Sequence, residues 1–350
     1  MRRPLTVLIA VLTALVVPAL AGCGSAADSA SSSASSGGSS GAAAGVAMPA
    51  AEGAVSYPVT LTSPYGETVL PKRPERLVAI APSGEDAALL LQLGVVPVAA
   101  AELINDTSEY VSSPGPADIK ERIKAEWSEV PPYEAIAALK PDAIVALRMS
   151  DGGGQLSADA FKRLTAIAPV ITDTAAVTTW QDAITVLGRA LDLPAAAKKV
   201  VTDSETFFTR FRAEHPSFEK KTGSWAIAYP DGLNYYLVPG SSPAGFFEDM
   251  GFVLNADSAE LAAQGNISAE TYSLLDADVI LLGKEDEASY KKVVDAQTFK
   301  NVPAVKAGRV ITLDLTGADA MVGWAIGFGG ADGLRWAAEK LEARLSETLP

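Results

Sequence analysis

Short runs of consecutive apolar residues recur along the chain from residue 76 onward. Such runs, without polar alternation, are typical of strands buried on both faces of a parallel sheet. In the first half of the chain they are Arg76–Ala81, Pro97–Ala101, Ala143–Leu147 and Pro169–Thr172. In the second half we expect strands at Trp225–Tyr229, Asn234–Val238, Asp278–Leu282 and Val310–Leu313.

Segments with helical spacing separate these runs. Gly84–Leu93 begins with acidic residues and is followed by Gly94, as helices often are. Further helices are expected at Pro132–Leu139, Ala244–Met250, Ala269–Leu275, Tyr290–Gln297 and Gly333–Leu345. Strands that alternate with helices predict an α/β fold built on parallel sheets.

One segment in the middle of the chain is much longer. Pro194–His215 carries apolar residues at three- and four-residue spacing and has proline in its first turn, which predicts a helix about 33 Å long. The layout is therefore two Rossmann-like α/β lobes joined by one long helix. The expected boundaries are residues 57–180 for the N-terminal lobe, 181–222 for the interlobe helix segment and 223–350 for the C-terminal lobe.

The first 56 residues follow a different pattern. A basic start, an apolar stretch from Leu5 to Val17 and the sequence Leu-Ala-Gly-Cys ending at Cys23 predict a lipoprotein signal peptide over residues 1–22. Cys23 would then be lipidated, although an ordinary signal peptide with an incidental cysteine is the alternative. Residues 23–56, rich in Ser, Ala and Gly, predict a flexible tether with a reach of roughly 32 Å.

The composition excludes several classes of function. A formal net charge of −14 argues against nucleic acid as a partner. One cysteine and one histidine exclude a disulfide framework, a zinc cluster and most Cys/His catalytic pairs. No acid–base or nucleophile set converges, because His215 ends the long helix and Gly240–Gly245 lacks the G-x-S-x-G pattern, so we expect no enzyme activity.

Candidate ligand-binding residues follow from strand ends. In open parallel sheets, ligands bind beyond the carboxyl ends of the strands. This rule selects Ser83, Glu102 and Arg148 in the first lobe, and in the second it selects Tyr229, Lys284 and Asp314–Thr316. Arg148 is the strongest candidate, since a half-buried guanidinium can donate two parallel hydrogen bonds to an anionic ligand. The alternative is a salt bridge from Arg148 to Glu102 or Glu129.

Several local phrases carry a family resemblance, which covers residues 57–345. They are Pro74–Ala79, Leu91–Val98, Glu134–Asp142, Trp180–Leu191, Ile267–Leu282 and the approach to the last strand through Gly308-Arg309-Val310. In this order and spacing they resemble bacterial substrate-binding lipoproteins of iron-siderophore, haem and cobalamin uptake. The resemblance implies a stiff helical spine, a ligand between the lobes and transfer of that ligand to an ATP-driven permease.

The resemblance also suggests site residues. Trp127 falls in a ligand-facing loop and Trp324 where the family often places a cleft aromatic, with core packing as the alternative for both. Some members carry an arginine near the first position, whereas this chain has Trp127-Ser128. Ser241 and Ser242 lie in a loop that could offer backbone amides to an anion or simply start a helix.

Tyr235 and Tyr236 alternate across a strand, so at most one faces the core. A tyrosine could ligate haem iron, although packing is the favoured role for this pair.

Permease docking in the resembling family uses surface acids, one in each lobe. Glu85 or Asp86 in the first lobe and Glu248 or Asp249 in the second are the candidates, although neither pair aligns cleanly with the family pattern.

We therefore predict a monomeric, lipid-anchored protein on the outer face of the cytoplasmic membrane. It would bind a ferric siderophore, use no cofactor and deliver its ligand to an ABC permease. The alternatives are a haem- or cobalamin-binding protein of the same fold, or a cell-envelope interaction protein that keeps the fold without transport.

Overall fold

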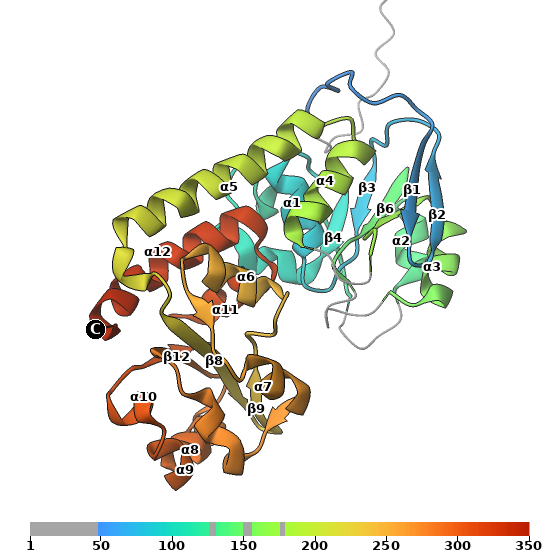
Figure 1. Cartoon of the computed structure of the whole chain (residues 1–350). Helices are drawn as coiled ribbons and strands as arrows, with labels where there is room; N and C mark the ends of the chain where they lie inside the picture. The colour runs from blue at the N-terminus through green and yellow to red at the C-terminus, as the bar shows by residue number, and fades with distance from the viewer. Residues whose placement is uncertain (1–47, 126–130, 150–155, 176–178, 350) are drawn as a thin grey trace, which may run out of the picture. The chain divides into compact units, whose positions relative to one another are not determined.

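The computed structural model describes residues 48–125, 131–149, 156–175 and 179–349 (Figure 1). Cys23 and Trp127 lie outside these ranges. No helix in the described ranges is long and apolar enough to cross a membrane. A small antiparallel hairpin, β1 (Val59–Ser63) with β2 (Gly66–Leu70), opens the fold and was not expected from the sequence.

The first sheet is five-stranded and entirely parallel. Its order is β5-β4-β3-β6-β7, and its strands are β3 (Leu77–Ala79), β4 (Ala99–Ala101), β5 (Glu121–Ile123), β6 (Ala143–Ala146) and β7 (Val170–Thr172). The structure confirms the four strands predicted from apolar runs and adds β5, which was not predicted because it is short and carries charges at its start. Successive strands move outward from β3 to β5, and the chain then returns to place β6 on the other side of β3. The order therefore reverses between β3 and β6, which makes this the topological switch point of the sheet.

Helices cover both faces of the first sheet. Val78, Ile144 and Val170 pack against Ile136 of α2 (Tyr133–Ala138) and Leu164 of α3 (Ala158–Thr165). The alternate strand residues Ala79, Val145 and Ile171 belong to the cluster formed with α1 (Glu85–Gln92) and α4 (Trp180–Ala190). Both faces of the sheet are therefore buried, which explains why its strands are continuous apolar runs in the sequence. Short 3₁₀ helices, η1 (Glu102–Glu109) and η2 (Pro116–Asp118), connect β4 to β5.

The second sheet is mixed. β8 (Thr222–Tyr229), β12 (Val279–Lys284) and β13 (Val310–Asp314) run parallel, and β10 (Val253–Leu254) pairs in parallel with the start of β8. β9 (Gly232–Tyr235) is antiparallel to β8, and β11 (Asn266–Ile267) is antiparallel to β9. A two-residue turn joins Tyr229 to Gly232, and a connection this short can only form a hairpin. The expected parallel arrangement of the second lobe is therefore correct for β8, β12 and β13, but the sheet as a whole is not purely parallel.

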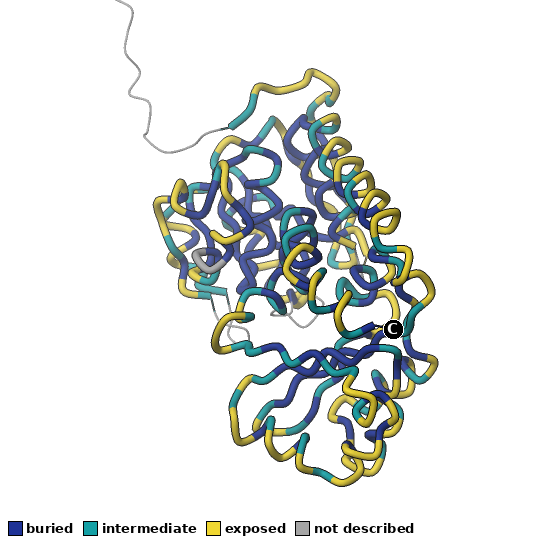
Figure 2. Tube along the Cα trace, turned by 90° about the vertical axis from the view of Figure 1, so that its left-hand side faces the viewer, coloured by how far each residue is buried: buried dark blue, intermediate teal, exposed yellow. Residues whose placement is uncertain are grey.

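The remaining elements of the second lobe lie between these strands or after β13. They are α6 (Ser242–Asp249), α7 (Ser258–Gln264), η4 (Ala269–Leu275), α8 (Glu287–Asp295), α9 (Gln297–Lys300), α10 (Pro303–Lys306), α11 (Ala320–Phe328) and α12 (Gly330–Thr348). The helix expected at residues 269–275 is a 3₁₀ helix. Figure 2 shows the buried strands and the exposed outer turns of the helices around them.

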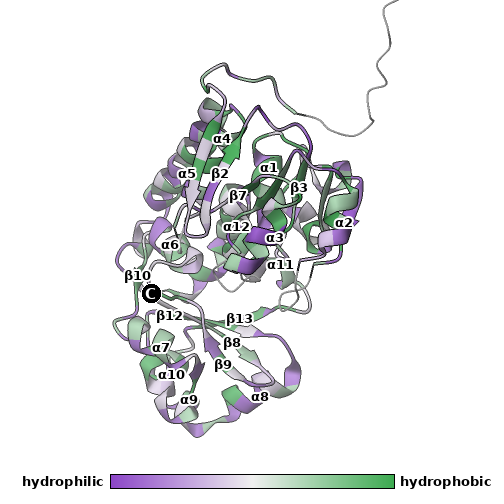
Figure 3. Cartoon of the chain, turned by 90° about the vertical axis from the view of Figure 1, so that its right-hand side faces the viewer, coloured by the Kyte–Doolittle hydropathy of each residue, from purple (hydrophilic) through white to green (hydrophobic). Residues whose placement is uncertain are grey.

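The long helix is α5 (Pro194–Glu214), as the sequence predicts. Its buried residues are Ala197, Ser204, Phe208 and Phe211, and its outer turns are hydrophilic (Figure 3). Phe208 meets Phe246 of α6 with ring centroids 6.3 Å apart, and Phe211 meets Phe218 in the 3₁₀ helix η3 (Pro216–Phe218) at 6.0 Å. An aromatic ladder therefore fixes the carboxyl end of α5 to the second lobe.

The last helix returns to the first lobe. α12 packs beside α5 and also contacts α1 and α4 (Figure 1). Gln92, at the end of α1, donates from Nε2 to the carbonyl of Gly329 at 3.1 Å and accepts from the amide of Ala331 at 3.2 Å, where α11 meets α12. The two lobes thus share a helical layer that the predicted domain boundaries did not anticipate.

The chain is held in place well before Tyr57. The Asp192 carboxylate accepts from the amides of Gly53, Ala54 and Val55, each at 2.9 Å. Glu52 in turn accepts from the amides of Ala195 and Ala196, which belong to the first turn of α5 and have no partner inside the helix. We call these contacts the N-terminal clasp. The expected end of the flexible tether at residue 56 is therefore wrong, because the clasp fixes the chain from Glu52 onward.

Candidate functional site

Arg148 lies at the switch point of the first sheet, just beyond the carboxyl end of β6. Its backbone φ of 57° is in the left-handed region, which few residues other than glycine adopt. The Arg148 amide donates to Asp173 Oδ2 at 2.7 Å, and Asp173 follows the neighbouring strand β7. This bond stabilises the turn at Arg148, where the chain leaves the extended conformation of β6.

The Arg148 side chain pairs with Glu85. Arg148 Nε lies 3.1 Å from Glu85 Oε1, and the two side chains are 4% and 1% exposed. The expectation of a half-buried arginine is therefore wrong. Neither acid proposed as its salt-bridge partner matches this contact: Glu102 is exposed at the start of η1, and Glu129 lies outside the described residues.

Gly84 places Glu85 at the switch point. Gly84 has φ 72°, and a Cβ atom there would lie 3.0 Å from the backbone of Ile104. The close approach of η1 turns the chain so that the first helical residue, Glu85, faces the interior beside β6. Ser83, also buried, accepts from the Glu85 amide at 3.3 Å and so supports the start of α1.

Asp86 is buried next to this pair. Its carboxylate accepts from the amides of Ile80 and Ala81 at 2.7 and 2.8 Å, and from that of Ala87 at 2.7 Å. Burial raises the pKa of Asp86 to about 7, although these hydrogen bonds act in the opposite direction. Because Glu85 and Asp86 are 1% and 0% exposed, the expectation that they form a docking surface is wrong.

Arg148 also reaches the second lobe. Its Nη2 donates to Ser242 Oγ at 3.0 Å, in the first turn of α6. Ser241 is the N-cap of that helix, and its Oγ accepts from the Ala244 amide at 3.3 Å. Of the two roles considered for this loop, the helix start is the one these contacts describe. Ser242 is thereby brought against Arg148.

A pair of tyrosines lies at the end of β8 and the turn after β9. The hydroxyls of Tyr229 and Tyr236 are 2.8 Å apart, and Tyr236 packs on Trp225 with ring centroids separated by 5.2 Å. Tyr235 points the other way, is buried, and meets Ser258 Oγ at 2.7 Å, so the predicted alternation is confirmed. Burial and the contact with Tyr236 raise the pKa of Tyr229. Trp225 was not a candidate, although its position four residues before Tyr229 placed both on one strand face.

Lys284 occupies the carboxyl end of β12. Its Nζ lies 3.2 Å from Asp314 Oδ2 at the end of β13 and 3.4 Å from Glu287 Oε2 in the first turn of α8. The hydrogen bond from Lys284 holds the pKa of Asp314 below its usual value. Trp324 is half-buried in α11 and meets Phe328 edge-to-face at 5.1 Å.

The second-lobe docking candidates occupy the end of α6. Glu248 is exposed, whereas Asp249 is half-buried. Burial raises the pKa of Asp249 to about 6, with Glu248 and Glu205 adding to the effect and Arg212 opposing it. Their proposed contact with a permease stays a prediction.

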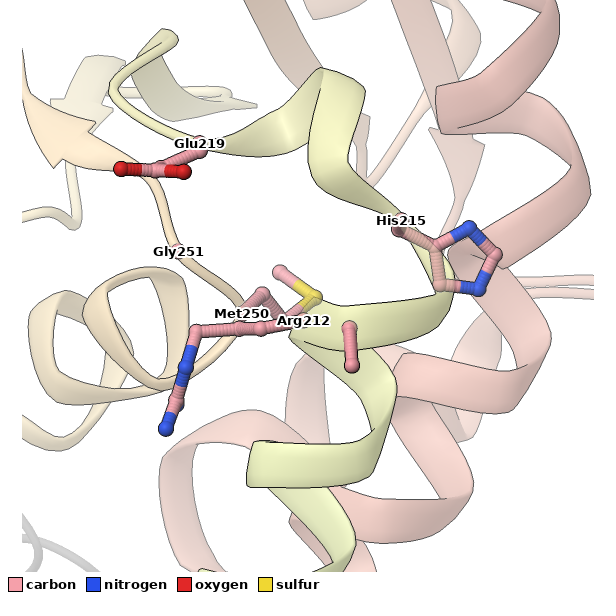
Figure 4. Close-up of a pocket in the computed structure, with 6 residues that line it drawn as sticks. Arg212, His215, Glu219, Met250 and Gly251 are labelled. Atoms are coloured by element: carbon pink, nitrogen blue, oxygen red, sulfur yellow. The ribbon is translucent and has the colours of Figure 1, made fainter.

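A pocket of about 310 Å³ lies elsewhere, between the carboxyl end of α5 and the turn after α6 (Figure 4). Arg212, His215, Glu219 and Met250 are among the residues that line it. His215 Nε2 lies 3.2 Å from Glu342 Oε1 of α12. This pocket is next to the amino end of β8, opposite the strand ends at which α/β sheets bind ligands.

The described residues contain no group of three or more His, Cys, Asp or Glu side chains that could hold a metal ion. Two α/β lobes with polar and aromatic residues at their strand ends, joined by a long helix, define a two-lobed solute-binding protein. The chain belongs to the periplasmic binding protein family, whose profile matches residues 80–315.

Relatives agree with this assignment. A probable siderophore-binding lipoprotein of Bacillus subtilis (strain 168), YfiY, is 25% identical in an alignment of 261 residues that covers 70% of this chain and 76% of YfiY. A periplasmic solute-binding protein of Mycobacterium smegmatis matches with a TM-score of 0.65 and 23% identity, over 83% of this chain and 99% of that one. PiaA of Streptococcus pneumoniae TIGR4, solved in complex with ferrichrome, matches with a TM-score of 0.66 and 20% identity, over 83% and 98%.

Proposed function

We propose that this chain captures a ferric siderophore between its lobes and delivers it to an ABC permease for iron uptake. The main support is the contact between Arg148 and Ser242, which brings a buried cationic group at the switch point of one lobe against the other lobe. The similarity to YfiY, described as a probable siderophore-binding lipoprotein, agrees with this ligand class.

The proposed ligand contacts come from both lobes. Arg148 and Glu102 contribute from the first lobe, with Trp127 in the adjoining loop of the sequence, and Ser242, Tyr229 and Trp324 contribute from the second. Ser83 and Ser241 hold the starts of α1 and α6, so we assign them to supporting the site. Stiff connections through α5 and α12 would allow modest closure around the ligand.

Membrane attachment and docking complete the proposal. Lipidated Cys23 would anchor a monomer to the outer face of the cytoplasmic membrane, and exposed Glu248 is the remaining candidate for permease contact, with Asp249 beside it. Cys23→Ala should move the protein from the membrane fraction to the soluble fraction of the host cell. An unchanged distribution would contradict the anchor.

Binding is tested by tryptophan fluorescence. We expect at least one ferric chelate among a trihydroxamate, a catecholate and citrate to quench the emission at micromolar concentration. Arg148→Gln should weaken that binding at least tenfold, whereas Arg189→Gln, which removes an exposed arginine bonded to the carbonyl of Thr60, should leave it unchanged. If no chelate binds, the siderophore proposal fails, and an envelope interaction role becomes the better account.

Haem is the second candidate, because the half-buried hydroxyls of Tyr229 and Tyr236 could approach an iron centre. The raised pKa of Tyr229 opposes this role, since a ligating tyrosine must lose its proton. A Soret shift on adding haem, lost in Tyr229→Phe, would favour haem over a siderophore.

A further inference from the structure

The charge balance at the strand ends restricts the kind of chelate the site can accept, an inference that rests on the proposed function. Beyond the carboxyl ends of the strands in the described ranges, the cationic side chains are Lys124, Arg148, Lys284 and Arg344, and Arg344 is paired with Asp319 at 2.9 Å. The acidic side chains there are more numerous: Glu85, Glu102, Asp173, Asp231, Glu285, Asp286, Glu287, Asp314 and Asp319.

The positive charge of Arg148 is already balanced inside the protein. Glu85 Oε1 lies 3.1 Å from Arg148 Nε, and both groups are almost wholly buried. At a distance, such a pair acts as a dipole and attracts an anion far less than a lone guanidinium does. Asp173, which accepts from the Arg148 amide at 2.7 Å, adds negative charge beside this pair.

Lys284 is balanced in the same way in the second lobe. Asp314 and Glu287 lie 3.2 and 3.4 Å from its Nζ. Asp231 and Glu285 lie near enough to the tyrosine pair to raise the pKa of Tyr236. The third cation, Lys124, is exposed and follows the edge strand β5, away from the switch point.

We propose that the ligand is an iron(III) chelate without net negative charge, of the trihydroxamate class, and that anionic chelates such as triscatecholates and citrate are disfavoured. Three hydroxamates neutralise one iron(III), whereas three catecholates leave a charge of 3−. An uncharged trihydroxamate still presents oxygen acceptors to Arg148 and to the tyrosine hydroxyls. A trianion would have to approach strand ends at which acidic side chains outnumber cationic ones, so electrostatic repulsion opposes its binding.

The first test compares chelates of different charge on the full mature chain. Fluorescence titrations with ferrichrome, ferrioxamine B, ferric enterobactin and ferric citrate should give at least tenfold tighter binding for a trihydroxamate at low salt. Equal or tighter binding of ferric enterobactin or ferric citrate would overturn this inference and leave the siderophore proposal intact. Absence of binding by all four would overturn both.

Salt provides a second, independent measurement. Repulsion between an anionic chelate and the acidic strand ends is screened at high ionic strength. Any residual binding of ferric enterobactin should therefore tighten between 50 and 500 mM sodium chloride. Weaker binding at high salt would mean that the site attracts the trianion, which contradicts the inference.

A pair of exposed acids tests the second lobe without disturbing the core. The side chains of Glu287 and Asp314 are 64% and 42% exposed, so the double variant Glu287→Gln with Asp314→Asn should fold. We expect severalfold tighter binding of ferric enterobactin and less than a twofold change for ferrichrome. Asp203→Asn, an exposed position on α5, serves as the charge-matched control for one substitution. An unchanged ratio between the two chelates in the double variant would refute the role of these acids.

Discussion

A hydrogen bond of 3.0 Å from Arg148 Nη2 to Ser242 Oγ connects the end of β6 in the first lobe to the first turn of α6 in the second. The donor carries a charge, and hydrogen bonds to charged groups contribute about 1.5–3 kcal/mol. Ser242→Ala should therefore lower the free energy of unfolding by about 1–3 kcal/mol, measured in urea. Thr206→Ala, which removes an exposed hydroxyl bonded only within α5, should change it by less than about 0.5 kcal/mol. Equal effects would show that the interlobe bond contributes nothing.

The buried pair of Arg148 and Glu85 should show strong coupling in a double-mutant cycle. Removing one member of a buried ion pair leaves an uncompensated charge and typically costs about 3–5 kcal/mol. We expect Arg148→Met and Glu85→Gln each to destabilise the protein by this order, and the double variant to lose clearly less than the sum of the two. Additive losses in urea unfolding would contradict the pairing.

Two glycines with similar φ angles allow the cost of backbone strain to be measured separately from the cost of steric crowding. Gly84 and Gly240 have φ of 72° and 84°, but only at Gly84 would a Cβ meet backbone, at 3.0 Å from Ile104. Gly240→Ala should cost about 1–2 kcal/mol, the usual penalty for an L-residue in this region. Gly84→Ala should cost more and should weaken ligand binding too, because it displaces Glu85. Similar losses at both positions would show that η1 moves aside easily.

The N-terminal clasp is expected to break when its acceptor is removed. Asp192→Ala leaves three backbone amides without their carboxylate, and we predict a loss of about 2–3 kcal/mol together with faster proteolysis near Glu52. Asp203→Ala, an exposed acid on α5, is the matched control and should leave both readouts unchanged. Protection of residues 52–55 that survives in Asp192→Ala would contradict the clasp.

Asp249 should make stability depend on pH. Its folded pKa of about 6 lies above the ordinary value of 3.8, so the folded state holds the proton more tightly than the unfolded chain. Stability therefore falls as the pH rises from about 4 through 6, and the ionised group carries a penalty above that range. Asp249→Asn should be more stable than the parent at pH 8 by about 1 kcal/mol, after allowance for partial exposure, and equal to it near pH 4. Glu260→Gln, which removes an exposed acid on α7, is the control and should leave the pH dependence unchanged. A gain independent of pH in Asp249→Asn would contradict this account.

Most of the fold could be predicted from the apolar runs in the sequence. The strands at Leu77–Ala79, Ala143–Ala146 and Val279–Lys284 and the long helix α5 follow directly from patterns in a few neighbouring residues. The return of α12 to the first lobe did not follow, because an apolar helix face shows that something covers it and does not identify the partner. The two-residue turn before Gly232 could have been recognised from its Pro-Asp-Gly sequence.

Arg148 lies at the strand end where the sequence placed it, but its electrostatic environment was misjudged. Arg148 was selected because it ends a buried strand, which local sequence reveals. Its partner Glu85 is distant in sequence, and acids in a first helical turn usually lie at the surface near the helix dipole. Only the tight turn at Gly84 and the approach of η1 turn Glu85 inward, and neither is encoded in the spacing of apolar residues.

The position of α12 also affects how the protein is made. This helix covers α1 and α4, and Gln92 needs the junction of α11 and α12 to satisfy its amide. A nascent chain that has completed only the first sheet therefore lacks the segment that covers it, because α12 follows the whole second sheet in the sequence. The first lobe should consequently not be recoverable as a stable recombinant fragment, and its folding should be completed only when α12 is present to cover it.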